Sequence, residues 1–142
     1  MANALYAKYR QAAASWSAAG LSAPIDLATD TIKVAAVTSG YAADTAADQY
    51  LSSVVLGTNG LGTPQTLAPS STSNGTLKAA NVTIPGVASG TVAALVVYKD
   101  TGNPATSPLI ARLDTVGGLP FTAVSAVSVS VAWDGTNGIF TL

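Results

Sequence analysis

Short segments in which apolar and small polar residues alternate recur along this chain, and this period of two constrains its fold most. In residues 125–133, valines at every second position and Trp133 fall on one side of an extended chain, whereas Ser128 and Ser130 fall on the other. Such alternation is typical of a strand with one buried and one polar face. The segment therefore predicts a half-buried strand in an antiparallel sheet.

Further strands follow from the same pattern, with Gly-, Asn- and Asp-rich turns between them. They are predicted at residues 31–38, 76–84, 91–99, 108–114 and 138–142, with one more at 65–68. Residues 91–99 are apolar on both faces, which predicts a central strand. The turn at 134–138 predicts an antiparallel hairpin between 125–133 and 138–142. We therefore expect a mainly β fold, an antiparallel β-sandwich or jelly-roll-like barrel of six to eight strands.

An N-terminal α-helix is predicted over residues 3–19, where Leu5, Tyr9 and Trp16 recur at helical spacing and Gly20 provides a stop. A shorter helix is predicted over 46–53. Its start would be Thr45, with Asp48 three residues on in a capping-box-like pair.

The length of 142 residues fits a single domain over 1–142. We divide it into an N-terminal helix or arm at 1–22 and a β-domain at 23–142. Residues 57–75 are rich in Gly, Ser, Thr and Pro. This composition predicts a long loop at one end of a sheet.

The chain has no His, no Cys and no Glu, and its seven acidic residues are all Asp. A Ser-His-Asp triad, a thiolate zinc site and a cysteine nucleophile are thereby excluded. The close pairs Asp26 with Asp30 and Asp44 with Asp48 supply two carboxylates each, whereas calcium takes six to eight oxygen ligands. We interpret them as parts of turns and caps, and we expect no enzyme activity, no metal site and no cofactor.

Charged residues make up 9% of the chain, against about 25% in an ordinary soluble domain. One interpretation is a surface largely covered by other subunits; the alternative is that Ser and Thr supply the polarity. The six basic residues form no run, so nucleic acid is not expected as a direct partner. The longest apolar run falls far short of the roughly 20 residues that span a bilayer, so no membrane contact is expected.

The candidate contact residues are Tyr6, Tyr9, Arg10 and Trp16, on or beside one face of the predicted N-terminal helix. Tyr, Trp and Arg are the residue types that dominate interface hot spots. The alternative is that this face packs against the chain's own sheet, and the sequence leaves both open. Trp133 and Phe140 are expected in the core.

Several sequence blocks, in order along nearly the whole chain, resemble a widespread group of small virion proteins of tailed bacteriophages. They are residues 1–12 (MANALYAKYRQA), 30–35 (DTIKVA), 94–102 (ALVVYKDTG), 105–111 (ATSPLIA), 118–120 (GLP), 133–135 (WDG) and 139–140 (IF). Residues 15–23 depart from the group's pattern by being longer.

The resemblance implies a structural role in the virion, assembled in the host cytoplasm. Small β domains of this size commonly serve as capsid decoration or cement proteins. Such a protein would bind across subunits of the major capsid protein, on the capsid surface, as a homo-oligomer such as a dimer or trimer. The alternatives are a tail or neck (connector) component and, from another class, a host carbohydrate-binding module.

Overall fold

The structure is a computed structural model that describes residues 3–116, 118–125, 127–134 and 138–141. With 41% strand and 13% helix and with antiparallel sheets, it confirms the predicted mainly β fold. The strands are β1 (Ala4–Leu5), β2 (Ile32–Val37), β3 (Gly60–Thr66), β4 (Pro69–Ser71), β5 (Thr76–Ala79), β6 (Val82–Val87), β7 (Gly90–Val92), β8 (Ala94–Lys99), β9 (Leu109–Leu113), β10 (Phe121–Ala123), β11 (Val127–Val131) and β12 (Phe140–Thr141). The helices are α1 (Ala7–Ala14), α2 (Leu56–Asn59) and two 3-10 turns at Leu51–Ser53 and Ser73–Gly75.

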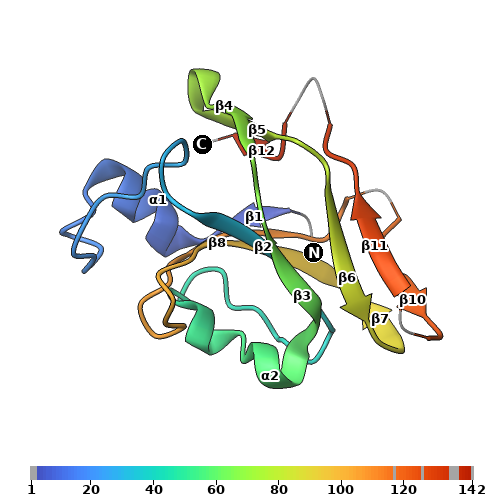
Figure 1. The fold of residues 1–142 in the computed structure, drawn as a ribbon. Coiled ribbons are helices and arrows are strands. Elements are labelled where there is room, and N and C mark those ends of the chain that lie inside the picture. Colours follow the sequence, from blue (N-terminus) through green and yellow to red (C-terminus); the bar gives the residue numbers. More distant parts are fainter. Residues whose placement is uncertain (1–2, 117, 126, 135–137, 142) are drawn as a thin grey trace.

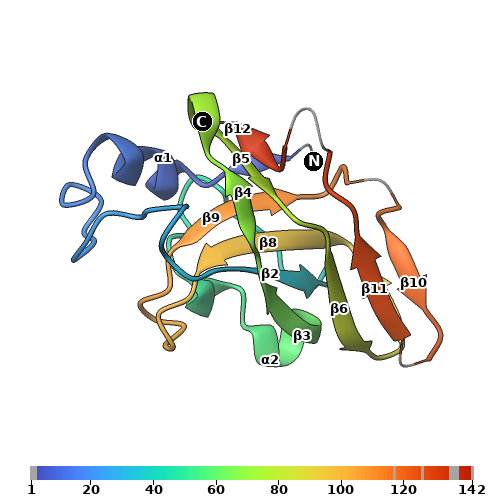
Figure 2. The same ribbon diagram turned by 45° about the horizontal axis from the view of Figure 1, so that its top comes forward.

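Within the described residues, the largest sheet has five strands in the order β1–β9–β8–β2–β3 (Figures 1 and 2). The central strand, β8, pairs with β2 and β9, so that Val97 lies opposite Val34 on one side and Ala111 on the other. All of β8 except Lys99 is buried, because a strand covered on both faces is apolar along its length. The central strand predicted within 91–99 is thereby confirmed, although β7 is separate from it.

Smaller sheets form a second layer: β4–β5–β12, β6–β11 and β7–β10 (Figure 2). The two layers meet where β3 lies against β6. A Cβ atom added to Gly62 of β3 would lie 2.7 Å from the Pro85 carbonyl oxygen and 2.9 Å from methyl groups of Ile84 and Val87. In the described part of the chain the sheets are small and not closed. The sandwich or jelly-roll-like barrel therefore stays a prediction.

The predicted hairpin between 125–133 and 138–142 is wrong. β11 pairs instead with β6, with Val129 opposite Ile84, and β12 pairs with β5. β6 offers β11 an apolar partner strand, whereas the local turn leaves only an isolated bridge between Asp134 and Gly138. Residues 135–137 of that turn lie outside the described residues. The predicted alternation in β11 is confirmed, since its serines are exposed and its valines are at least half-buried.

The long loop predicted at 57–75 is also wrong, because this stretch holds most of α2, together with β3 and β4. Pro64 has no backbone N–H to donate to a neighbouring strand, and β3 tolerates it because β3 lies at the edge of the five-stranded sheet. Gly62, with φ of +71°, allows the close approach to β6. Glycine and proline therefore mark an edge strand here.

The predicted N-terminal helix exists but is shorter than 3–19. Residues before it form β1, in which Ala4 lies opposite Arg112 and Leu5 opposite Ala111 of β9. α1 ends at Ala14, and Ser15 is extended. Pairing with the edge of the sheet outweighs the propensity of the first residues for helix.

The second predicted helix, 46–53, is replaced by a turn at 45–47 and the 3-10 turn at Leu51–Ser53. The capping residue is Asp44 and not Thr45: its Oδ1 accepts the backbone N–H groups of Ala46 and Ala47 at 3.0 and 3.1 Å. Asp48 reaches back to accept the N–H of Asp44 at 3.0 Å. The reciprocal pair was expected, and it begins one residue earlier.

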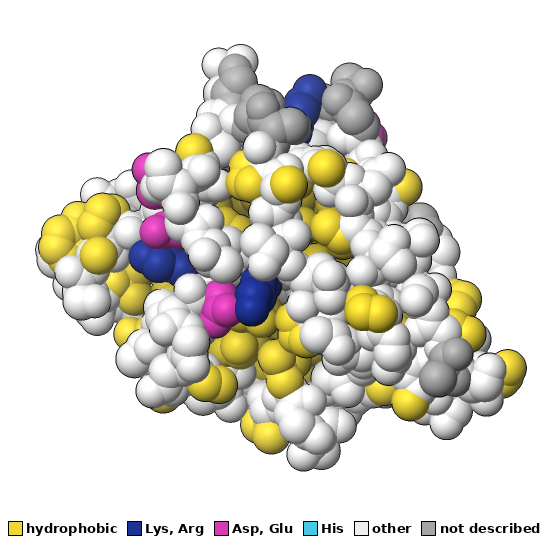
Figure 3. Space-filling model, in the orientation of Figure 1, with side chains coloured by type: hydrophobic (Ala, Val, Ile, Leu, Met, Phe, Trp, Pro, Cys, Tyr) yellow, Lys and Arg dark blue, Asp and Glu magenta, His cyan; other side chains and the backbone are white. Residues whose placement is uncertain are grey.

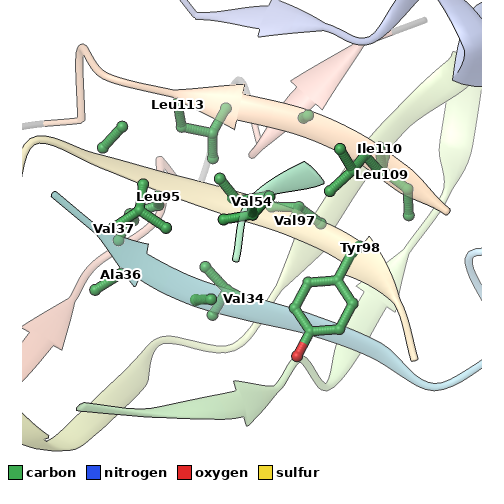
Figure 4. Packing of buried hydrophobic residues seen from close by; sticks show 14 of the residues in the cluster. Val34, Ala36, Val37, Val54, Leu95, Val97, Tyr98, Leu109, Ile110 and Leu113 are labelled. Atoms are coloured by element: carbon green, nitrogen blue, oxygen red, sulfur yellow. The ribbon is translucent and has the colours of Figure 1, made fainter. Parts of the chain in front are cut away.

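The hydrophobic core fills the space between the layers and continues over the outer face of the large sheet. Figure 4 shows side chains from β2, β8 and β9 in contact, and Val54, from the turn after Leu51–Ser53, lies among them. Val34, Val97 and Leu109 are completely buried. No helix in the described ranges is long and apolar enough to cross a lipid bilayer.

Candidate functional site

Tyr6, a predicted contact residue, is completely buried in the protein's own core. It follows β1, and its backbone N–H donates to the Ile110 carbonyl of β9 at 3.0 Å. Its hydroxyl lies 2.8 Å from that of Tyr41. Tyr6 therefore holds the N-terminal segment against the sheet, and in the chain by itself its side chain is not accessible to a partner.

The two tyrosines and Asp48 form a directed chain of hydrogen bonds. The Tyr41 hydroxyl donates its one proton to Asp48 Oδ2 at 2.7 Å, so the Tyr6 hydroxyl is the donor to Tyr41. Burial raises the pKa of Tyr6 to about 12 and raises that of Tyr41 as well, where the hydrogen bond donated to Asp48 adds to the effect. Neither phenol ionises near neutral pH.

Tyr9 is buried too, so its side chain is also inaccessible to a partner in the chain by itself. Its ring packs edge-on against Phe140, with ring centres 6.1 Å apart and planes at 80°. This geometry suits two aromatic quadrupoles and holds α1 against β12. The alternative interpretation, in which the helix packs against its own sheets, accounts for both tyrosines.

Arg10 and Trp16 remain accessible. Arg10 lies on the exposed side of α1, and Trp16, in the turn after the helix, keeps 38% of its surface exposed. Trp16 borders a groove of about 490 Å³ between α1, residues 24–27 and the turn before β5. We name this the α1 groove. Its wall is formed by Tyr9, Ala12, Trp16, Ile25, Leu27 and Thr76, among others.

The acidic pairs noted in the sequence are structural, as interpreted. Asp26 Oδ1 accepts the N–H of Ala28 at 2.9 Å, and Asp30 Oδ2 accepts the N–H of Asp26 at 2.8 Å. The bond from Ala28, with others from Thr29, holds the pKa of Asp26 below its usual value. Together with the Asp44 and Asp48 turn, this arrangement uses each carboxylate to close a local turn. Among the described residues, acidic side chains form no group of three or more suited to a metal ion.

Ion pairs tie β2 to β8 at one end. Lys33 Nζ lies 2.6 Å from Asp100 Oδ2, and Lys99 Nζ lies 3.0 Å from Asp30 Oδ2. Lys33 thereby lowers the pKa of Asp100. In the view of Figure 3, basic and acidic side chains lie side by side, with hydrophobic side chains near them. These charges are engaged within the fold.

Trp133 and Phe140 pack partly buried against the core, as expected. They border a second groove, of about 670 Å³, between the β1–β9 edge and the C-terminal strand. Leu5 and Leu113 line the facing wall. A sugar-binding platform needs an exposed ring face, and both rings are partly covered.

Exposed apolar residues occur at places that the sequence reasoning missed. Phe121, at the start of β10, is 38% exposed, and Val124, just after β10, is 87% exposed. A signal was present, because residues 115–133 contain no charged residue.

Comparison with protein families, curated proteins and solved structures gives no match to this chain.

Proposed function

We propose that this chain is a non-enzymatic structural subunit of a tailed-phage particle, and that it acts as a decoration (cement) protein on the capsid surface. It would bind across subunits of the major capsid protein and stabilise the mature head. The observation that carries the proposal is that the acidic side chains form hydrogen bonds and ion pairs within the fold. Apolar side chains and a few cations then remain on the surface for contacts.

The acidic side chains illustrate this. Six of the seven Asp residues close turns or pair with cations within the chain: Asp26, Asp30, Asp44, Asp48, Asp100 and Asp114. Catalysis by Tyr as a nucleophile or base requires a lowered pKa, whereas burial raises the pKa of Tyr6, Tyr9 and Tyr98 to about 12. With His, Cys and Glu absent from the sequence, these findings support binding over catalysis.

The accessible surface favours protein contacts. Trp16 and Phe121 are each 38% exposed, and Arg10 is exposed on α1. Aromatic residues and Arg are enriched in protein interfaces, where charged side chains other than Arg are depleted. We therefore keep Arg10 and Trp16 as the contact residues proposed from the sequence. We also infer that the two layers of sheet form an irregular sandwich, which would present these residues from a rigid body.

A cement protein acts by linkage, because it binds only the assembled, expanded shell. Each site stabilises that state by RT ln(1 + [L]/Kd), which is about 2.7 kcal/mol when the free protein is at a hundred times its Kd. Many copies, each bound weakly, then add up over a shell. A low charge content suits such a contact, since fewer ions lose their hydration on binding.

The test is a binding assay with expanded heads that lack this chain. Purified wild-type protein should cosediment with the heads and raise their temperature of disruption. Arg10→Ala should bind more weakly, whereas Ser22→Ala, a change at another exposed position, should bind like wild type. Cosedimentation with isolated tails and not with heads would overturn the cement role and favour the tail or neck alternative.

A further inference from the structure

The groove of about 670 Å³ beside Trp133 lies between the edges of two sheets. Among the described strands, β1 ends the five-stranded sheet on one side, and β12 ends the sheet β4–β5–β12. Residues of both strands line this groove, which we name the seam. Each of these strands pairs with a neighbour on one side only. The seam is therefore a concave space bordered by two strand edges.

The backbone of Leu5 in β1 is directed away from the sheet. The Tyr6 N–H donates to the Ile110 carbonyl at 3.0 Å, so Tyr6 and Ile110 form a hydrogen-bonded pair that continues the register of β1 with β9. Such pairs alternate with non-hydrogen-bonded pairs in an antiparallel ladder. Leu5, opposite Ala111, is therefore a non-hydrogen-bonded pair, and its N–H and C=O point away from β9. An added strand could pair with both groups.

The side chains of the seam suit an extended, largely apolar segment. Leu5 and Leu113 line one wall, and Trp133 and Phe140 line the other. Asp134 is the one charged residue among the described lining residues, so an acidic segment is disfavoured. The indole Nε1 of Trp133 is buried, and it has no hydrogen-bond partner within the part of the chain that the structure describes. A strand supplies both apolar side chains at every second position and backbone carbonyl acceptors.

Other pairings of groove and occupant fit less well. The α1 groove offers no free strand edge, because β5, which borders it at Thr76, already pairs with β4 and β12. A second copy of this chain would have to release a strand to fill the seam, since each described strand already pairs within its own copy. The seam therefore favours an extended segment of a different protein.

We propose that the seam binds an extended segment of a partner protein, which adds to β1 as a further strand. The segment would carry apolar side chains at alternate positions and no acidic ones. Main-chain hydrogen bonds would then supply affinity, and the apolar side chains would supply specificity.

The inference deepens the proposed function and rests on it for the identity of the partner, which would be a subunit of the major capsid protein. The seam adjoins the contact surface already proposed, because β1 leads directly into α1 and Tyr9 of α1 packs against Phe140. In Figure 2, α1, β1 and β12 all lie along the upper side of the molecule. One partner could therefore cover both surfaces.

The test is cosedimentation of the full chain with expanded heads that lack it. Ala132 is exposed and lines the seam, so Ala132→Lys places a long charged side chain there without entering the core. This variant should bind about 30-fold or more weakly, the size of a hot-spot loss. Ala80→Lys is the matched control, because Ala80 is also exposed and does not line the seam. It should bind like wild type.

Strand addition itself is tested at Leu5. Leu5→Pro removes the N–H that points away from β9, and an edge strand tolerates proline on that side. Binding should weaken about tenfold, the loss of one main-chain hydrogen bond, whereas Leu5→Val keeps the N–H and should bind nearly like wild type. If circular dichroism shows that Leu5→Pro is unfolded, hydrogen exchange of wild type replaces it. The Leu5 amide should then exchange more slowly when the chain is bound to heads.

The outcomes separate the two proposals. If wild type binds heads while Ala132→Lys binds equally well, or while the Leu5 amide gains no protection, strand addition at the seam is overturned and the cement role stands. If wild type does not bind heads, the cement role fails, and with it the partner assigned to the seam. Self-association of wild type that Ala132→Lys abolishes would make a second copy the occupant and would also overturn the inference.

Discussion

Replacing Gly62 with Ala probes the contact between the two layers of sheet. Gly62 has φ of +71°, and an added Cβ would lie 2.7 Å from the Pro85 carbonyl oxygen and 2.9 Å from methyl groups of Ile84 and Val87. The nearest atom is backbone, which cannot rotate away. Relief would require β3 to move off β6.

The expected loss of stability has two parts. The left-handed backbone conformation costs a residue with a Cβ roughly 1–2 kcal/mol. Forcing a methyl group into a packed site costs roughly 1–3 kcal/mol more. Gly86 separates these parts, because its φ is +69° but nothing lies within 4 Å of an added Cβ. Gly86→Ala should therefore show only the backbone part.

Urea unfolding followed by circular dichroism gives both free energies of unfolding. Gly62→Ala should be less stable than Gly86→Ala by about 2 kcal/mol, a difference of roughly 4–8 °C in melting temperature for a chain of this size. Equal stability of the two variants would refute the close approach of β3 to β6, and with it the arrangement of the layers.

Other expectations concern the buried hydroxyls and the aspartate turns. Because burial raises the pKa of Tyr6, Tyr9 and Tyr98 from 10.0 to about 12, the folded state keeps their protons longer than the unfolded state. The contribution of these tyrosines to stability should therefore be constant below about pH 10 and fall between about pH 10 and 12, as urea unfolding at each pH in this range would show; a flat profile from pH 9 to 12 would contradict their burial. Tyr41→Phe should cost roughly 1–3 kcal/mol, because it leaves the buried Tyr6 hydroxyl without its acceptor, and full stability in thermal unfolding would contradict the hydrogen-bond chain. Asp44→Ala should cost roughly 0.5–2 kcal/mol by the same measurement, whereas no loss would argue against its capping role.

Local periodicity predicted the strands well where burial is regular. The segments around β2, β8, β9 and β11 were recognisable because their alternation or continuous apolarity reflects one or two buried faces. The sequence predicted less well which strand pairs with which. The 134–138 turn suggested a local hairpin, whereas β11 pairs with β6, a choice that depends on which distant apolar face is available.

The candidate site could be predicted only in part. Helical spacing correctly placed Tyr9 on one face of a helix, but periodicity cannot say whether a face meets its own sheet or a partner. Tyr6 lies directly after β1 and not within the helix, because the N-terminal residues pair with the edge of β9. Tyr41 was missed because its role depends on Tyr6, 35 residues away in the sequence. Val124 was overlooked because an exposed valine in an alternating segment resembles a buried one.

Cryo-electron microscopy of the phage particle that carries this chain tests the cement role most directly. The proposal expects density for the two-layered β domain at regular sites over the expanded head, with the exposed side of α1 against the major capsid protein. Heads without such density, with copies of the chain confined to the tail, neck or a single vertex, would contradict it.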